Sequence, residues 1–182
     1  MAGQNLYKLI ETKSFRGRSP QIPCVFISHR QADKNAAKAL ADYLLSIDID
    51  IYFDEYDGLL SVAATSGNTE KVVMYIENGL TYSTHLLGVI STSTKGSWWV
   101  PFEIGHARRR TIPVSYLLID NVDFLPEYLR IASRLKDEYE LAEWIRKDLG
   151  RQVFVEIKSE SSFNIPGLVK FRYPEPSFAE ES

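Results

Sequence analysis

The sequence predicts an α/β domain, in which a doubly wound, five-stranded parallel sheet carries helices on both faces. Two observations support this fold class. Short apolar runs alternate along the chain with segments whose apolar residues recur every three or four positions, which is the alternation of strands and helices. Five such strands fall between residues 24 and 135. Parallel neighbours need crossover connections, and right-handed crossovers through helices place those helices on the faces of the sheet.

The composition is that of one globular domain. The chain has 182 residues, of which 45% are hydrophobic and 25% are charged, and its formal net charge is -3. These values exclude disordered, collagen-like and disulfide-rich chains, and the small excess of acidic residues disfavours nucleic acid as a partner. The single cysteine, Cys24, cannot close an intramolecular disulfide, which favours the cytoplasm. No apolar run approaches the roughly 18 residues of a membrane-spanning helix, so we expect no membrane partner.

The first strand is predicted at 24–27, a continuous apolar run typical of a strand covered on both faces. Asp33 is suited to cap the following helix, whose small and apolar residues continue to Leu45. At 47–53 apolar and polar residues alternate, which predicts a second strand with one exposed face at the edge of the sheet. That edge position favours the strand order 2-1-3-4-5, in which ligands bind beyond the carboxyl ends of the strands.

The remaining elements continue the alternation. Residues 55–68 form a long polar stretch, and loops of this length in compact domains are commonly functional. We then expect helices at 69–80, 98–110 and 139–149, strands at 86–90 and 114–119, and a weaker strand at 131–135. Pro101 belongs in a first helical turn, so the helix that contains it must begin close to Trp98.

The chain divides into three parts on this interpretation. Residues 1–22 form an N-terminal arm, and residues 23–150 form the domain. Residues 151–182 form a C-terminal extension with a possible extra strand at 153–157 and an acidic tail.

Several functions are excluded by absent motifs. The chain has neither a G-x-G-x-x-G run after its first strand nor a P-loop, which excludes dinucleotide dehydrogenases and P-loop NTPases. A phosphoacceptor receiver domain needs an acidic pair where this chain has Ser28-His29-Arg30. His29, His85 and His106 lack metal-ligand spacing, so no metal is expected. His29 faces the expected cleft, or it is a loop histidine satisfied by backbone hydrogen bonds; the other two are interpreted as structural.

The strongest candidate for chemistry is the pair Trp99 and Glu103. Residues at positions i and i+4 share one helical face, so both side chains project together from the start of a helix. The helix dipole stabilises a carboxylate there, and an adjoining indole limits access of water. Such an acid can hold ribose hydroxyls and stabilise an oxocarbenium-like transition state. Alternatively, Trp99 fills the core and Glu103 only complements the helix dipole.

Taken in order, four segments resemble a TIR domain, and the likeness covers roughly residues 22–150. They are Val25-Phe26-Ile27-Ser28-His29, the helix after Asp33, Ile51-Tyr52-Phe53-Asp54-Glu55 and Ser97-Trp98-Trp99-x-x-x-Glu103. The resemblance implies a flavodoxin-like sheet, with 55–68 as the family's BB loop. Enzymatic TIR domains cleave the nicotinamide–ribose bond of NAD+ with a glutamate, which in bacterial members lies in a W-x-x-x-E motif that Trp99 and Glu103 match.

The resemblance also implies roles for individual residues. Glu103 would be catalytic, and Ser28, His29, Arg30, Tyr56, Asp57 and Trp99 would line the NAD+ pocket. NAD+ would be the substrate, with no cofactor and no metal. Capture of the ribose by water gives ADP-ribose, and capture by an atom of the same molecule gives a cyclic isomer. Small bacterial TIR proteins of this kind resemble the sensor-synthases of Thoeris anti-phage defence, whose product activates a separate effector.

Two other functions stay open. Many TIR domains assemble with one another, so the chain could be a non-enzymatic interaction module anchored by Trp98, Tyr56, Leu59 and Leu60. It could also be a glycosidic-bond enzyme that resembles nucleoside deoxyribosyltransferases, which use a glutamate in an α/β sheet. One departure affects the site: Pro101 lies inside the W-x-x-x-E motif and could tilt the first helical turn.

Overall fold

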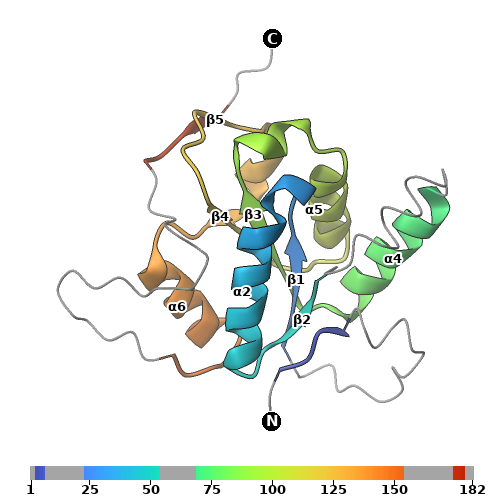
Figure 1. Ribbon diagram of the computed structural model, residues 1–182, viewed down its shortest axis with the longest axis vertical. Helices are drawn as coiled ribbons and strands as arrows, with labels where there is room; N and C mark the ends of the chain where they lie inside the picture. Colours follow the sequence, from blue (N-terminus) through green and yellow to red (C-terminus); the bar gives the residue numbers. More distant parts are fainter. Residues whose placement is uncertain (1–2, 7–22, 54–68, 154–173, 179–182) are drawn as a thin grey trace.

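The computed structural model describes residues 3–6, 23–53, 69–153 and 174–178. The expected loop at 55–68, with Tyr56, Asp57, Leu59 and Leu60, lies outside the described residues, as does most of the possible strand at 153–157. Within the described residues the chain forms a five-stranded parallel sheet in the order β2-β1-β3-β4-β6, with helices on both faces (Figure 1). The predicted fold class is confirmed.

Nearly all predicted elements are present. The strands of the main sheet are β1 (Cys24–Ser28), β2 (Asp50–Tyr52), β3 (His85–Ile90), β4 (Val114–Leu118) and β6 (Ser133–Arg134). The helices are α2 (Lys34–Ser46), α4 (Thr69–Tyr82), α5 (Trp99–Arg109) and α6 (Glu138–Lys147), with 3-10 turns η1 (Gln31–Asp33), η2 (Thr92–Gly96) and η3 (Glu127–Ile131). A separate two-stranded sheet pairs β5 (Phe124–Leu125) with β7 (Ser177–Phe178). Because β6 is the predicted fifth strand, the principal order 2-1-3-4-5 is also confirmed.

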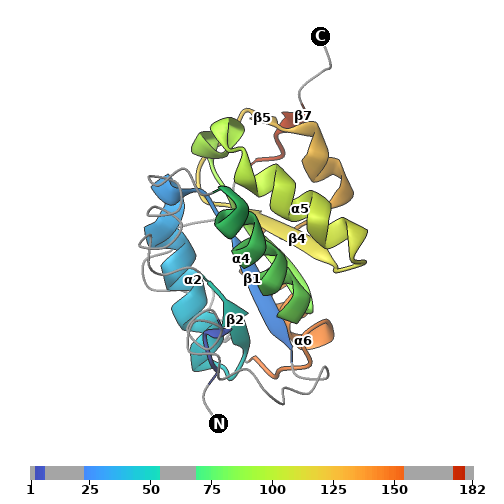
Figure 2. The ribbon, with the colours of Figure 1, turned by 90° about the vertical axis from the view of Figure 1, so that its right-hand side faces the viewer.

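The sheet is covered by one hydrophobic core on each face. Phe26 points into the core formed with α4 and α5, whereas Val25 and Ile27 point into the core formed with α2 and α6. In Figure 2, α4 and α5 lie in front of β1 and β4. Successive side chains of a strand project to opposite faces, so a strand buried on both faces must be apolar at every position. This explains why β1 is a continuous apolar run.

The predicted exposed face of the second strand is wrong. Tyr52 is buried, and its ring stacks on Phe26 with 5.3 Å between the ring centroids. The Tyr52 hydroxyl donates a hydrogen bond to the Tyr75 carbonyl of α4 over 3.0 Å. A Cβ atom at Gly79 would lie 2.4 Å from the Tyr52 ring, so Gly79 lets α4 approach this strand. Tyr52 counts as a polar residue in the alternating sequence pattern because of its hydroxyl, but the hydroxyl is hydrogen-bonded and the ring is buried.

Residues 3–6 lie along the outer side of β2. Asn5 forms an isolated parallel bridge with Ile51, and its side chain exchanges two hydrogen bonds with the Phe53 backbone, of 2.9 and 3.2 Å. Leu6 is buried in the core beneath α4. These contacts cover an edge that would otherwise present unpaired backbone groups. The sequence pattern contained no signal for them.

The residues 174–178 are attached beside β6. The Glu175 carboxylate forms ion pairs with Arg134 (2.9 Å) and Lys136 (2.7 Å), and the Arg130 guanidinium lies 4.4 Å above the Phe178 ring. In the part of the chain that the structure describes, no helix is both long and apolar enough to span a bilayer.

Candidate active site

Ser28 and Glu103 meet at the carboxyl edge of the sheet. Ser28 ends β1, Glu103 lies in the second turn of α5, and the Ser28 hydroxyl donates a hydrogen bond of 2.5 Å to Glu103 Oε2. Both are buried, and Glu103 is only 9% exposed. Glu103 shares the buried face of α5 with Val100, Ile104 and Ala107, where helix packing normally requires apolar residues. Burying a carboxylate there is costly unless it is hydrogen-bonded, and Ser28 supplies such a bond.

The start of α5 places Glu103 without distortion by Pro101. The helix begins at Trp99, and the Val100 amide donates to the Ser97 hydroxyl over 3.2 Å. Pro101 is the third residue of the helix, where its missing N–H removes no intrahelical bond. The prediction that this helix begins close to Trp98 is confirmed.

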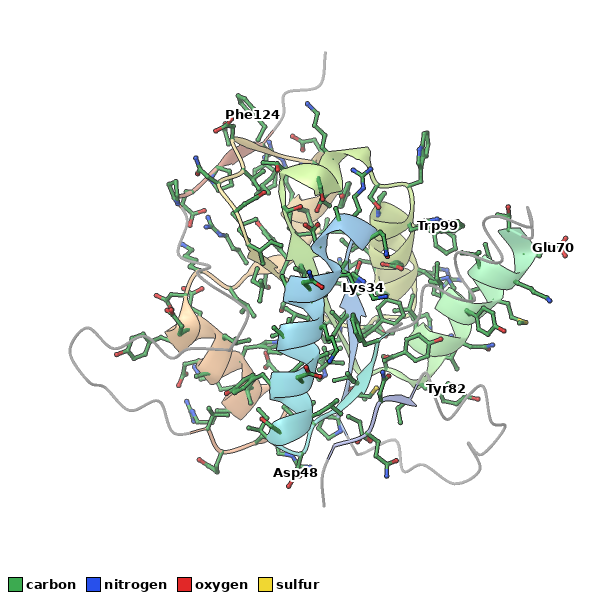
Figure 3. All side chains as sticks on the ribbon, in the orientation of Figure 1. Lys34, Asp48, Glu70, Tyr82, Trp99 and Phe124 are labelled. Carbon is green, nitrogen blue, oxygen red and sulfur yellow. The ribbon has the colours of Figure 1, made fainter. Side chains whose placement is uncertain are left out.

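Trp99 lies at the surface. It is 37% exposed, and its ring makes an edge-to-face contact with Phe102 at 6.0 Å between centroids. Figure 3 shows Trp99 at the start of α5. Trp98 is 89% exposed. The alternative in which Trp99 fills the core is therefore wrong, and part of the indole is accessible at the surface.

His29 and Arg30 follow Ser28 on the same loop. The His29 ring packs 5.1 Å from the Phe53 ring, and its Nδ1 lies 3.3 Å from the Ile27 carbonyl oxygen. The Arg30 guanidinium donates a hydrogen bond to the Ser93 carbonyl of η2. This bond joins the loop after β1 to the loop after β3.

Asp33 has a different role from the one expected. It occupies the N-cap position of α2, but its side chain makes no cap hydrogen bond. Instead its Oδ2 accepts hydrogen bonds from the Ser91 hydroxyl (2.7 Å) and the Ser93 hydroxyl (2.8 Å). The predicted capping interaction is therefore wrong. The buried Ser91 hydroxyl and the half-buried Ser93 hydroxyl need this acceptor more than the first turn of α2 does, since η1 precedes that turn and already continues its hydrogen bonding.

A second carboxylate extends this network. Asp120, which follows β4, accepts hydrogen bonds from the Thr92 amide (3.0 Å) and the Thr92 hydroxyl (2.8 Å). Ser91 and Thr94 form a reciprocal capping box at the start of η2. Hydrogen bonds thus connect the loops that follow β1, β3 and β4 into one polar cluster. The first of these loops begins directly after Ser28.

The sequence predicts residues 91–97 only as a polar loop. Its run of serine and threonine directly after a buried strand was the available signal, because such residues hydrogen-bond nearby backbone and side chains. Their partner Asp33 lies 58 and 60 residues away along the chain, so local patterns could not identify it.

The arrangement offers one kind of chemistry above others. Strand order reverses between β1 and β3, and open α/β sheets bind ligands beyond the carboxyl strand ends at this position. A buried, hydrogen-bonded carboxylate there can accept bonds from ligand hydroxyls and stabilise developing positive charge. Across the described ranges, no three His, Cys, Asp or Glu side chains are grouped so that they could hold a metal ion.

A comparison with known protein families identifies a family for most of the described domain. A family model described as the TIR domain matches residues 25–140, which extend from β1 into α6 and include Ser28, Asp33 and Glu103. No curated protein and no solved structure matches the chain.

Proposed function

This chain belongs to the TIR-domain family, whose members serve as signalling or NAD+-cleaving modules, and we propose that it cleaves the nicotinamide–ribose bond of NAD+. The observation that carries this proposal is the 2.5 Å hydrogen bond from Ser28 to the buried carboxylate of Glu103. Glu103 occupies the glutamate position of the W-x-x-x-E motif, and a module that served only for assembly would not need a buried, oriented carboxylate at the ligand-binding edge.

In the proposed reaction Glu103 accepts hydrogen bonds from the ribose hydroxyls. The C1′–nitrogen bond breaks, the electron pair leaves with nicotinamide, and positive charge develops on the ribose C1′ and ring oxygen. The fixed carboxylate offsets that charge in a site with little water. Water then adds to C1′ and releases a proton, which gives ADP-ribose; attack by an atom of the same molecule gives a cyclic ADP-ribose isomer instead.

The other proposed site residues divide by what they contact. Ser28 holds the Glu103 carboxylate, so we propose it as a positioning residue within the pocket. Arg30 uses one guanidinium N–H on Ser93 and has further donors for a diphosphate, while the Trp99 indole offers a flat surface for a planar ring. His29 adds a polar ring next to Ser28. Tyr56 and Asp57, which lie outside the described residues, complete the proposed pocket.

We further propose that the product is a signal. TIR domains self-associate, and small bacterial members resemble synthases whose nucleotide product activates a separate effector in anti-phage defence. On this proposal the chain acts in the cytoplasm, where NAD+ is present, and its assembly controls its activity.

A non-enzymatic interaction module is the second candidate. Three aromatic side chains, Trp98, Trp99 and Phe102, are exposed together at the start of α5, with exposed fractions of 89%, 37% and 36%. Exposed aromatic residues are frequent anchors of protein interfaces. Assembly and catalysis are compatible, but only the second requires Glu103.

The decisive experiment compares nicotinamide release from NAD+ by the wild type, Glu103→Gln and Glu70→Gln. Glutamine keeps the shape and an oxygen acceptor for Ser28 but removes the charge, so we expect at least about a 100-fold loss of turnover. Glu70→Gln makes the same change on the exposed first turn of α4 and should keep full turnover.

Equal release by the wild type and Glu103→Gln would contradict the assignment of Glu103. Concentration-dependent assembly with no NAD+ turnover by the wild type would favour the interaction module. Cleavage of free nucleosides without cleavage of NAD+ would favour a deoxyribosyltransferase-like enzyme.

A further inference from the structure

A second cleft lies at the opposite, amino edge of the sheet. It has a volume of about 670 Å³ and lies between the end of α5, the start of β4, β6 and one side of α6. The hollow arises because β6 has only two residues and pairs only with Ser115 and Tyr116, which leaves the first residue of β4 without a neighbour on that side. The Ser28–Glu103 pair lies at the other end of the strands, so the two sites are separate.

The floor of the cleft contains an unpartnered hydroxyl. Ser115 lines the cleft and is 5% exposed, and within the described residues no group hydrogen-bonds to its side chain. Ser133 is its register partner on β6 and lines the same cleft, so both side chains project to one face. Buried hydroxyls normally have a hydrogen-bond partner. An unpaired one directed at an open cleft is therefore available to a ligand.

One exposed carboxylate at the cleft, Asp148, favours a cation. Asp148 is the C-cap residue of α6, where the helix dipole destabilises a carboxylate. Among the described residues no cation lies within ion-pair distance of Asp148, whereas Glu143 is paired with Arg146 and Lys147 at 2.8 Å each. Glu140 also lines the cleft, but its carboxylate already accepts a hydrogen bond from the Lys136 amide over 2.8 Å, and Arg108 contributes one positive charge. Asp148 is therefore the lining carboxylate whose side chain has neither a hydrogen bond nor an ion pair within the described residues.

The nearby histidine does not balance Asp148. His85, at the start of β3, contacts the Trp144 indole edge-on at 6.0 Å. Burial lowers the pKa of His85 below its usual value, and the negative charge of Asp148 only partly opposes this shift. The imidazole is therefore neutral at pH 7, and the attraction of Asp148 for a cation is retained.

The walls between the polar groups are apolar. Val114, Leu135 and Trp144 are buried and present their remaining surface to the cleft, while Ile131 is 49% exposed at its rim. A suitable ligand must therefore combine a cationic head with an apolar chain. Aliphatic amines have this composition, because methylene groups can cover the apolar wall while the ammonium group donates hydrogen bonds.

We propose that the amino-edge cleft binds an aliphatic ammonium group, whose head donates hydrogen bonds to Ser115 and Asp148 and whose methylene chain covers Val114 and Leu135. A free diamine and the lysine side chain of a partner polypeptide share this chemistry. The proposal does not depend on NAD+ cleavage, since it concerns binding at the opposite edge of the sheet.

Calorimetric titration of the full chain, without NAD+, tests the proposal with three probes. They are 1,5-diaminopentane, the α-acetyl amide of lysine, and 1,5-pentanediol as the uncharged control. We expect saturable binding of an amine and binding of the diol that is weaker by about tenfold or more, because a charged hydrogen bond is lost. Binding of the diamine identifies a free amine as the ligand, and binding of the lysine amide alone identifies a partner's side chain.

Two variants locate the site. Asp148→Asn and Ser115→Val should each weaken amine binding by about tenfold, because each removes an acceptor for the ammonium group. Asp42→Asn, which removes an exposed carboxylate from α2, should bind like the wild type. The proposal is overturned if neither amine binds the wild type, if the diol binds as tightly as the amines, or if Asp148→Asn binds the amine as tightly as the wild type.

Discussion

The two edges of the sheet treat their polar side chains in opposite ways. At the carboxyl edge, Ser28 is bonded to Glu103, and Asp33 is bonded to Ser91 and Ser93; all of these residues are buried except the half-buried Ser93. At the amino edge, Ser115 and Asp148 face an open cleft without a partner among the described residues. The first arrangement holds its groups in place before any ligand arrives, and the second leaves its groups for a ligand to satisfy.

This difference has a physical meaning. A reacting carboxylate stabilises a transition state best when it is already oriented, because no reorganisation is needed during the reaction. A binding cleft gains affinity when ligand contacts satisfy groups that were unpaired before binding. The carboxyl edge therefore fits the proposed catalytic role, and the amino edge fits the proposed binding role.

The largest expected contrast between the edges is in stability. Asp33→Ala removes the acceptor of the buried Ser91 hydroxyl and of the half-buried Ser93 hydroxyl, so we expect the free energy of unfolding to fall by about 2–3 kcal/mol. Asp148→Ala removes a carboxylate from the unfavourable end of α6, so we expect a change within about 0.5 kcal/mol. Urea denaturation measures both values. Asp33→Asn, which keeps one oxygen acceptor, should fall between the wild type and Asp33→Ala; equal losses for Asp33→Ala and Asp148→Ala would refute the contrast.

A smaller effect is expected on catalysis from the residue that orients Glu103. Ser28→Ala should lower kcat by about tenfold and change KM by less than about twofold, because it removes a bond to the reacting carboxylate rather than to NAD+. The matched variant is Ser46→Ala, at the exposed end of α2, which should keep the wild-type kcat. A rise in KM at constant kcat would instead show that Ser28 binds the substrate directly.

The smallest expected effect is a dependence of the free energy of unfolding on pH, which arises from His85 at the amino edge. Burial lowers the pKa of His85 in the folded protein, so the unfolded chain binds this proton more readily. The contribution of His85 to the free energy of unfolding should therefore be constant above about pH 6.5. It should decrease as the pH falls through the folded-state pKa of His85. His85→Phe should show a shallower decrease between pH 7.5 and pH 5.5 in urea denaturation, while NAD+ turnover stays intact. An unchanged slope would show that His85 does not carry this dependence.

The elements of the fold were predictable because their signals are local. The apolar run of β1 reflects burial on two faces, and Pro101 placed the start of α5 to within a residue. The proposed role of Glu103 was also reachable from sequence, through the spacing from Trp99. Glu103 also lies in the apolar stripe of α5. Positions in such a stripe are normally apolar and buried, so the place of Glu103 in it was a further signal that its carboxylate is buried.

Other features depended on residues far apart in the chain. Tyr52 looked exposed because it alternates with apolar neighbours, but Gly79 allows α4 to cover it. Asp33 had the position of a helix cap, but two hydroxyls from the loop after β3 provide its hydrogen bonds. The residues 3–6 carried no strand pattern, yet they pair with the edge of β2.

The sequence alone thus determined the class of fold, the order of its elements and the position of the candidate carboxylate, because periodicity and helix-start signals act over a few residues. Tertiary structure alone decided which polar groups are paired. Hydrogen bonds form between atoms that the sheet brings to one edge, and their free energy depends on burial and on distance in space. Ser28 acquires its partner, and Ser115 is left without one among the described residues, only when the strands are assembled.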